Sequence, residues 1–210
     1  FGYETSLPVT VDELLPLVRA VSRTAKRSLV LADLPFGSYQ GSTEQCFHTA
    51  VRFMKEGGAH AVKLEGGSEM VPQVTKLTSS GIPVMAHIGF TPQAEHQLGG
   101  YRVQGRGEAA DALVELAQEM EQAGAFALLL EMIPGEVAQR ITSSVKIPTV
   151  GIGAGSECDA QVLVWQDMAG LRTGKLPRFV KQYADMRTVL LEAASAYMDD
   201  VRSGQFPGPE

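Results

Sequence analysis

The chain has 210 residues, of which 44% are hydrophobic and 20% are charged, an ordinary composition for a globular protein. A net charge of −6 without a basic cluster argues against nucleic acid as a partner. Cys46 and Cys158 lie far apart, so neither a disulfide framework nor a zinc site is expected. No run approaches the roughly 18 apolar residues of a membrane span, and no leader is recognisable. We therefore expect a soluble, cytoplasmic protein without a membrane partner.

Helical and extended patterns alternate along the chain. An acidic turn behind Thr10, followed by apolar spacings of three and four, predicts a helix that ends near residue 23. Apolar runs closed by turn residues predict buried strands at residues 28–35, 61–67, 82–89, 126–131, 147–155 (with a glycine loop) and 160–167. Further helices are predicted at residues 42–56, 71–80, 109–123, 137–143 and 179–203. Residues 90–107 form a long loop, a kind of segment that is usually functional.

This alternation predicts βαβ units and a parallel sheet. We expect one domain over residues 1–210, with an irregular tail at residues 204–210. Two architectures compete: an open, doubly wound sheet of six strands, or a (β/α)8 TIM barrel whose first two βα units are not in this chain. The barrel is favoured because polar residues recur at the predicted strand ends, where barrels place their chemistry. These residues are Asp33, Lys63, Glu65, His87, Glu131 and, as a further candidate, Asp167.

The strand at residues 61–67 carries two of these polar groups. Side chains two residues apart on a strand share a face, so Lys63 and Glu65 project to the same side of the sheet. Charged residues are rarely buried unless they are paired, so an edge strand with solvated charges is the alternative. The repetition of polar strand ends favours a catalytic site.

The residue types at the strand ends suggest separate roles. Asp33 and Glu65 are oxygen donors suited to Mg²⁺, which takes only one or two carboxylates from a protein; the alternative for Asp33 is a helix or loop cap. Lys63 could neutralise a substrate carboxylate or a developing enolate. Glu131 follows three leucines, which suits a general base, although a structural ion pair is the alternative. His87 is either a hydrogen-bonded core residue or a group that supports the metal-binding carboxylates from behind.

Six segments carry a more specific signal. They are Leu31-Ala-Asp-Leu-Pro35, Ala61-Val-Lys-Leu-Glu-Gly-Gly67, Met85-Ala-His-Ile-Gly-Phe-Thr-Pro-Gln93, Leu98-Gly-Gly-Tyr-Arg-Val-Gln-Gly105, Leu130-Glu-Met-Ile-Pro134 and Gly151-Ile-Gly-Ala-Gly155. Their order and spacing resemble the motif series of the ketopantoate hydroxymethyltransferase family over nearly the whole chain. The resemblance implies a barrel of the phosphoenolpyruvate/pyruvate type. It also implies Mg²⁺-dependent transfer of a hydroxymethyl group from 5,10-methylenetetrahydrofolate to 3-methyl-2-oxobutanoate, the first committed step of pantothenate synthesis.

The resemblance also implies residue roles. Asp33 would ligate Mg²⁺ and contact the keto acid, and Lys63 would bind the keto acid. Glu65 would be a metal-site carboxylate, and Glu131 would accept the proton. A large homo-oligomer, a decamer in the family, is expected as well. The chain departs from the family at its N-terminus, since the family's Asp-Ser pair at the end of the second strand would precede Phe1, and at Ala160, where the family usually has Gly.

Two rival functions stay open at the level of sequence. One is a metal-dependent lyase of the same barrel superfamily that cleaves a C–C bond of a 2-oxo acid. The other is a non-catalytic assembly subunit or fragment. Dependence of turnover on methylenetetrahydrofolate separates the transferase from the lyase.

Overall fold

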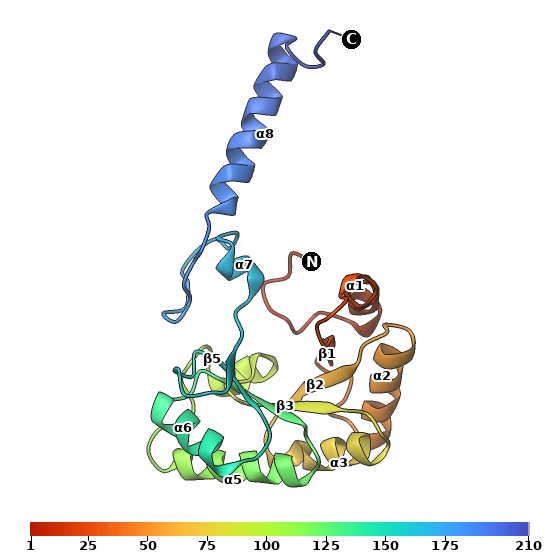
Figure 1. The fold of residues 1–210 in the computed structure, drawn as a ribbon, viewed down its shortest axis with the longest axis vertical. Helices are drawn as coiled ribbons and strands as arrows, with labels where there is room; N and C mark the ends of the chain where they lie inside the picture. Colours follow the sequence, from red (N-terminus) through yellow and green to blue (C-terminus); the bar gives the residue numbers. More distant parts are fainter. Residues whose placement is uncertain (210) are drawn as a thin grey trace. The chain divides into compact units, whose positions relative to one another are not determined.

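The structure is a computed structural model that describes residues 1–209 (Figure 1). It divides into two compact units, Phe1–Gln161 and Val162–Glu210, and Glu210 itself lies outside the described residues. The single domain expected over residues 1–210 stays a prediction.

The first unit contains a parallel sheet whose strand order follows the chain. Its strands are β1 (Leu31–Asp33), β2 (Ala61–Glu65), β3 (Val84–Gly89), β4 (Ala127–Glu131), β5 (Thr149–Ile152) and β6 (Ala160–Gln161). Each strand pairs in parallel with the next one in sequence. A doubly wound sheet would reverse its order at a switch point. The doubly wound alternative is therefore wrong, and the described chain forms six strands of a (β/α) barrel.

One helix precedes the first strand and the others lie in the connections between strands, following one another along the outside of the sheet (Figure 1). The longer ones are α1 (Val11–Thr24), α2 (Thr43–Lys55), α3 (Val71–Ser79), α5 (Ala109–Gln122) and α6 (Gly135–Ser144). Short turns η1 (Ser68–Met70), η2 (Pro92–Ala94) and α4 (Glu95–Leu98) lie in the connections, the last two within the predicted long loop.

Local sequence explains where the first two helices begin. Thr10 and Glu13 form a reciprocal capping box at the start of α1, with Glu13 N donating to Thr10 Oγ1 and Thr10 N donating to Glu13 Oε2. This arrangement satisfies two backbone donors that the first turn leaves free. Ser42 caps α2 by accepting a hydrogen bond from the backbone N–H of Gln45.

The pleat of the strands separates an apolar face from a polar one. Residues on one face pack against the helices and form the core: Ala32, Val62, Leu64, Val84, Ala86, Ile88, Leu128 and Leu130. Residues between them project to the opposite face, because successive side chains of a strand alternate. That second face carries the predicted site residues Asp33, Lys63, Glu65, His87 and Glu131.

The second unit contains α7 (Trp165–Met168) and α8 (Met186–Ser203) and corrects three expectations. The strand predicted at residues 160–167 ends at Gln161. Asp167 consequently lies in a helix, where its Oδ2 is 3.4 Å from Nη1 of Arg172, and not at a strand end. The long helix begins seven residues later than predicted, because Asp185 caps it by accepting a hydrogen bond from Thr188 N.

Residues 204–209 contain neither helix nor strand, and Glu210 of the predicted tail lies outside the described residues. Within residues 1–209, none of the helices combines the length and the apolar character that crossing a bilayer requires.

Candidate active site

Strand register brings the predicted site residues to one edge of the sheet. Asp33 lies beside Lys63, and Glu65 lies beside His87. Glu131 lies beside Gly89, which is two residues after His87 on β3. Neighbouring strands are about 4.8 Å apart, so side chains from adjacent strands can touch.

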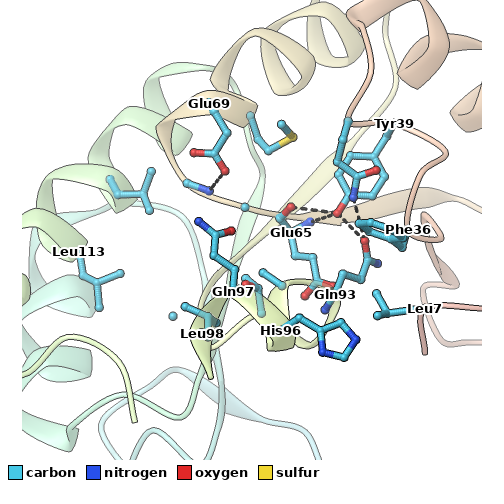
Figure 2. Close-up of a pocket in the computed structure, with 18 residues that line it drawn as sticks. Leu7, Phe36, Tyr39, Glu65, Glu69, Gln93, His96, Gln97, Leu98 and Leu113 are labelled. Atoms are coloured by element: carbon cyan, nitrogen blue, oxygen red, sulfur yellow. Dashed lines mark hydrogen bonds between the residues drawn. The ribbon is translucent and has the colours of Figure 1, made fainter. Parts of the chain in front are cut away.

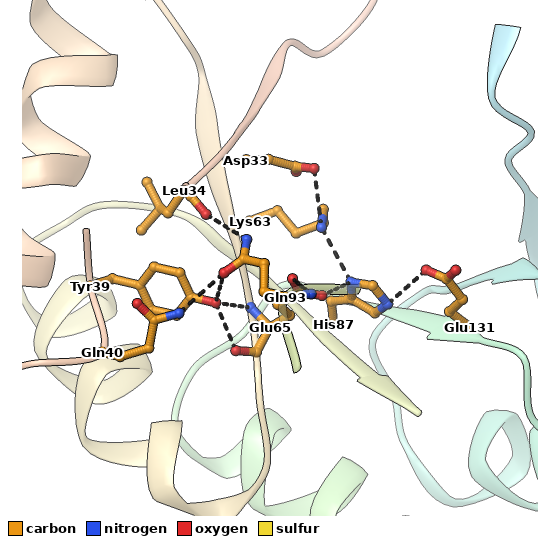
Figure 3. A network of polar contacts seen from close by, with 9 residues as sticks. All are labelled: Asp33, Leu34, Tyr39, Gln40, Lys63, Glu65, His87, Gln93 and Glu131. Atoms are coloured by element: carbon orange, nitrogen blue, oxygen red, sulfur yellow. Dashed lines mark hydrogen bonds and ion pairs between the residues drawn. The ribbon is translucent and has the colours of Figure 1, made fainter. Parts of the chain in front are cut away.

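The five side chains form a continuous network (Figure 3). Lys63 Nζ lies 3.2 Å from Asp33 Oδ2 and 3.2 Å from His87 Nδ1. His87 Nδ1 is also 3.2 Å from Glu65 Oε2, and His87 Nε2 is 3.2 Å from Glu131 Oε2. The imidazole therefore bridges the ends of β2 and β4.

Burial differs strongly along this network. The His87 side chain is only 2% exposed, whereas Asp33 is 57% exposed. Glu65 is as buried as His87, and Lys63 and Glu131 are largely buried. Asp33 is thus the member most accessible to a ligand from solvent. The edge-strand alternative for residues 61–67 is wrong, because β2 lies between β1 and β3.

Two atoms at the centre of the network have unused hydrogen-bonding capacity. Glu65 Oε2 and His87 Nε2 are buried without a hydrogen-bond partner, although each lies 3.2 Å from an oppositely charged or chargeable atom. These contacts have ion-pair distances without the angles of a hydrogen bond. Leaving a buried polar atom unsatisfied costs about 1–3 kcal/mol, so such atoms call for a functional explanation.

Glu65 is held by two residues that the sequence did not reveal. Its Oε1 accepts a hydrogen bond of 2.9 Å from the backbone N–H of Gln93. The hydroxyl of Tyr39 lies 2.9 Å from the carbonyl oxygen of Glu65 and accepts a 3.3 Å hydrogen bond from its N–H. Gln93 closes one of the six motifs, but its role was not apparent, and Tyr39 lies in the loop after β1.

The surroundings of Tyr39 keep its hydroxyl group protonated. Its side chain is fully buried. Burial, followed by the neighbouring Glu65 carboxylate, raises the pKa of Tyr39 far above its usual range. The phenol therefore stays neutral and keeps its O–H as a donor.

The backbone behind Glu131 has an unusual conformation. Met132 has φ of +47°, in the left-handed region that few side chains adopt. Met132 N donates to Ile152 O and Met132 O accepts from Gln104 N, each at 2.9 Å. Phe90 N also donates to Glu131 O at 2.8 Å. Strained residues held in this way cluster at functional sites, and this one immediately follows the proposed base.

A pocket of about 760 Å³ opens beside Glu65 (Figure 2). Its walls come from the segments after β1, β2 and β3 and from α5, and include Phe36, Tyr39, Glu69, Gln93, His96, Gln97, Leu98 and Leu113. Among the predicted site residues only Glu65 lines it. The pocket therefore reaches the network at Glu65.

The two carboxylates suit Mg²⁺ bound largely by water, and not a metal ion enclosed by protein ligands alone. Across residues 1–209, no group of three or more His, Cys, Asp or Glu side chains is arranged to hold a metal ion. Mg²⁺ keeps several waters and takes one or two carboxylates, so fewer protein ligands suffice. Buried Glu65 Oε2, which lacks a hydrogen-bond partner, and the exposed carboxylate of Asp33 have the chemistry that this ion requires.

Comparisons with solved structures agree on the fold. The chain resembles phosphonopyruvate hydrolase with a TM-score of 0.57 at 16% identity, covering 95% of this chain and 69% of that one. It also resembles a putative lyase/mutase from Burkholderia cenocepacia J2315, with a TM-score of 0.52 at 16% identity, covering 96% and 70%. The predicted fold class is confirmed: the chain is a partial α/β barrel.

Sequence relatives are much closer. The family model described as ketopantoate hydroxymethyltransferase matches residues 1–209. A protein of Nocardioides sp. (strain ATCC BAA-499 / JS614), named 3-methyl-2-oxobutanoate hydroxymethyltransferase, is 72% identical over the whole chain, which spans 71% of that protein. An Arthrobacter sp. (strain FB24) protein of the same name is 65% identical and is spanned to 70%. With the strand-end network in place, these matches show that the chain belongs to the ketopantoate hydroxymethyltransferase family of enzymes.

Proposed function

We propose that the chain transfers a hydroxymethyl group from 5,10-methylenetetrahydrofolate to 3-methyl-2-oxobutanoate, giving 2-dehydropantoate. The observation that carries the proposal is the contact chain from Asp33 through Lys63 and His87 to Glu131, in a chain whose relatives are named for that keto acid. The folate donor and Mg²⁺ come from the family resemblance of the motifs. A decameric homo-oligomer stays a prediction from the same resemblance, and a cytoplasmic location stays a prediction from the sequence.

Lys63 and Asp33 are the residues proposed to bind the keto acid. The ammonium of Lys63 offers three donors and no acceptor, and in the structure it is shared between Asp33 and His87. A substrate carboxylate would compete with Asp33 for this ammonium. Asp33, released from this ion pair and more than half exposed, would then be available as one of the residues that hold Mg²⁺.

Asp33 and Glu65 would hold Mg²⁺. When bound, the ion polarises the 2-oxo group of the substrate, which makes a proton on the neighbouring C3 carbon easier to remove.

Glu131 is the proposed acceptor of the C3 proton. When Lys63 donates to His87 Nδ1, the ring hydrogen of a neutral imidazole lies on Nε2, which faces Glu131 Oε2 at 3.2 Å. A small rotation of either side chain would turn this contact into a hydrogen bond, through which His87 would orient the carboxylate that takes the proton. If Glu131 were only a structural ion-pair partner, removal of the C3 proton would not depend on its carboxylate.

The remaining steps join two carbons. The carbanion at C3 attacks the methylene carbon of the folate donor, and the C–C bond forms as a C–N bond to the folate breaks. Water then displaces the second C–N bond and supplies the hydroxyl group, while the two folate nitrogens take up the proton removed from C3 and one proton of the water. One keto acid, one methylenetetrahydrofolate and one water thus give 2-dehydropantoate and tetrahydrofolate. Lys63 needs no covalent link to the substrate in this sequence.

The decisive experiment is to follow the keto acid by NMR with and without methylenetetrahydrofolate. It uses the chain and an extended form, in which residues 1–210 are joined to the parts of the Nocardioides relative that they do not cover. We expect 2-dehydropantoate only when both the donor and Mg²⁺ are present. Consumption of a 2-oxo or 2-hydroxy acid without the donor would instead support a lyase, and no turnover in either form would support the non-catalytic alternative.

A further inference from the structure

The two oxygens of the Glu65 carboxylate have different surroundings. Oε1 accepts a hydrogen bond from Gln93 N at 2.9 Å. Oε2 is buried without a hydrogen-bond partner and lies 3.2 Å from His87 Nδ1. A free carboxylate can rotate and exchange its two oxygens, so the bond at Oε1 determines which oxygen faces the imidazole.

The backbone N–H of Gln93, which donates to Oε1, is held in place by hydrogen bonds of the Gln93 side chain (Figure 3). Gln93 Nε2 donates to Leu34 O at 2.9 Å, just beyond the end of β1. Gln93 Oε1 lies 2.8 Å from the hydroxyl of Tyr39 and accepts a 3.1 Å hydrogen bond from Gln40 Nε2. The side-chain amide thus ties the segment after β3 to the segment after β1.

Tyr39 completes this arrangement through its hydroxyl group. Its hydroxyl contacts Gln93 Oε1 and both backbone polar atoms of Glu65. The ring is fully buried, so the hydroxyl has little freedom to move. The ends of β1 and β2 and the segment after β3 are therefore held together at one carboxylate.

We propose that Tyr39 and Gln93 are positioning residues, which act by fixing the Glu65 carboxylate toward His87. Through His87, the same arrangement sets the orientation of Glu131, since the imidazole contacts both carboxylates. The kinetic consequence rests on the proposed function, whereas the orientation of His87 does not. Preorganisation of this kind matters because a misplacement of about 1 Å can cost up to roughly 10²-fold in rate.

The test compares Tyr39→Phe and Gln93→Met with two matched controls. Tyr3→Phe removes an exposed hydroxyl that binds Glu13. Thr78→Val removes a part-buried side-chain hydrogen bond to the distant carbonyl of Ala123. Neither control contacts Glu65, so they report the general effect of losing one such hydrogen bond.

The first readout is the ¹⁵N NMR signal of the His87 ring nitrogens, measured in the extended form. The chain has only four histidines, and His87→Gln identifies the relevant signals. We expect both Tyr39→Phe and Gln93→Met to shift them, because the negative charge of the Glu65 carboxylate, 3.2 Å from Nδ1, moves. Unchanged His87 signals in both variants, or equal shifts in the controls, would overturn the proposal even if the variants lower the melting temperature.

The second readout is exchange of the keto acid C3 proton into deuterated water, measured in the extended form. We expect kcat to fall by about 10- to 10²-fold, while the KM for the keto acid stays within a few-fold. The double variant should lose little more than either single one, since both act on one network. If the unaltered protein shows no exchange, the proposed function fails, and the NMR result alone judges the positioning role.

Discussion

At the scale of single residues, charge balance constrains what the network can do. Three carboxylates, from Asp33, Glu65 and Glu131, contact one ammonium and one imidazole. A neutral imidazole leaves an excess of negative charge, and uncompensated charge is costly where side chains are buried. A bound divalent cation would remove that excess. This balance supports Mg²⁺ independently of the motif resemblance.

Replacing Glu131 with Gln should separate binding from chemistry. Glutamine keeps the shape of the side chain but cannot accept a proton. Exchange of the C3 proton, followed by NMR in deuterated water with the extended form, should fall by about 10²–10⁴-fold. The affinity for the keto acid should stay within a few-fold, because Lys63 and Asp33 are untouched. Undiminished exchange would mean that another group is the base.

Asp33→Ala should abolish the dependence of keto acid binding on Mg²⁺. The exposed carboxylate is one of two proposed protein ligands, and Mg²⁺ with a single carboxylate left is held mainly by water. Isothermal titration calorimetry of the extended form, with and without Mg²⁺, measures this. Asp111→Ala is the matched control, because Asp111 is also an exposed, ion-paired aspartate, bound to Arg140. An unchanged Mg²⁺ titration in Asp33→Ala would refute the assignment.

Cys46 should make the protein less stable at alkaline pH. Burial raises the pKa of this thiol to about 12, whereas in the unfolded chain it has its ordinary value of about 8.5. Because the folded pKa is the higher one, the stabilisation is complete below about pH 8.5. It is lost as pH rises toward 12, by up to about 1.4 kcal/mol per pH unit. Urea unfolding of the extended form at pH 8 and pH 10 should show a smaller loss of stability for Cys46→Ala than for the protein with Cys46.

At the scale of elements, one glycine permits β3 and β4 to approach at the site. Gly89 has φ of +97°, and a Cβ there would collide with the backbone oxygen of Glu131 and with Ile133. Gly89→Ala should therefore destabilise the protein and displace Glu131, with a loss of C3 proton exchange. The comparison is Gly81→Ala, where φ is +83° but the added Cβ would meet no atom within 4 Å.

Left-handed backbone costs a non-glycine residue about 1–2 kcal/mol, which both alanine variants should show in urea unfolding. The excess loss in Gly89→Ala measures the collision. Equal stability and equal exchange in the two variants would show that strand approach at Gly89 is unimportant.

Most elements could be predicted from local patterns. Helix starts at Thr10 and Ser42, and strands that end in charged residues, follow from short-range rules that the sequence obeys. The end of the last strand was predicted wrongly because the apolar run after Gln161 resembles a buried strand. Only Ala160 and Gln161 actually pair with β5, and the chain then turns into α7. Pairing depends on a partner that periodicity does not show.

The candidate site likewise contains residues that the sequence predicted and residues that it did not. Asp33, Lys63, Glu65, His87 and Glu131 each lie near the carboxyl end of a predicted strand, so their convergence followed from parallel topology. Tyr39 and Gln93 were missed because their bonds to Glu65 span 26 and 28 residues and start from irregular segments. Outside the site, the start of α8 could have been predicted from Asp185, a residue type that caps helices, but the periodicity of the preceding residues obscured it.

At the scale of the whole molecule, the sheet of the described chain has two free edges. β1 pairs only with β2, and β6 pairs only with β5. Each edge strand presents backbone donors and acceptors without partners, which invite association with other chains. A closed barrel has no such edges.

We therefore expect residues 1–210, expressed alone, to form heterogeneous aggregates and to show neither Mg²⁺-dependent keto acid binding nor turnover. Pairing both edges would satisfy their backbone donors and acceptors, and a gain of even a few kcal/mol is large beside the roughly 5–15 kcal/mol that separates a folded domain from its unfolded chain. The extended form should accordingly give a defined oligomer, a cooperative thermal transition and C3 proton exchange. Light scattering, calorimetric melting and the NMR exchange assay, applied to both forms in parallel, measure these properties. A monodisperse, cooperatively melting and catalytically active preparation of residues 1–210 would show that six strands suffice for this site and that the free edges carry no penalty.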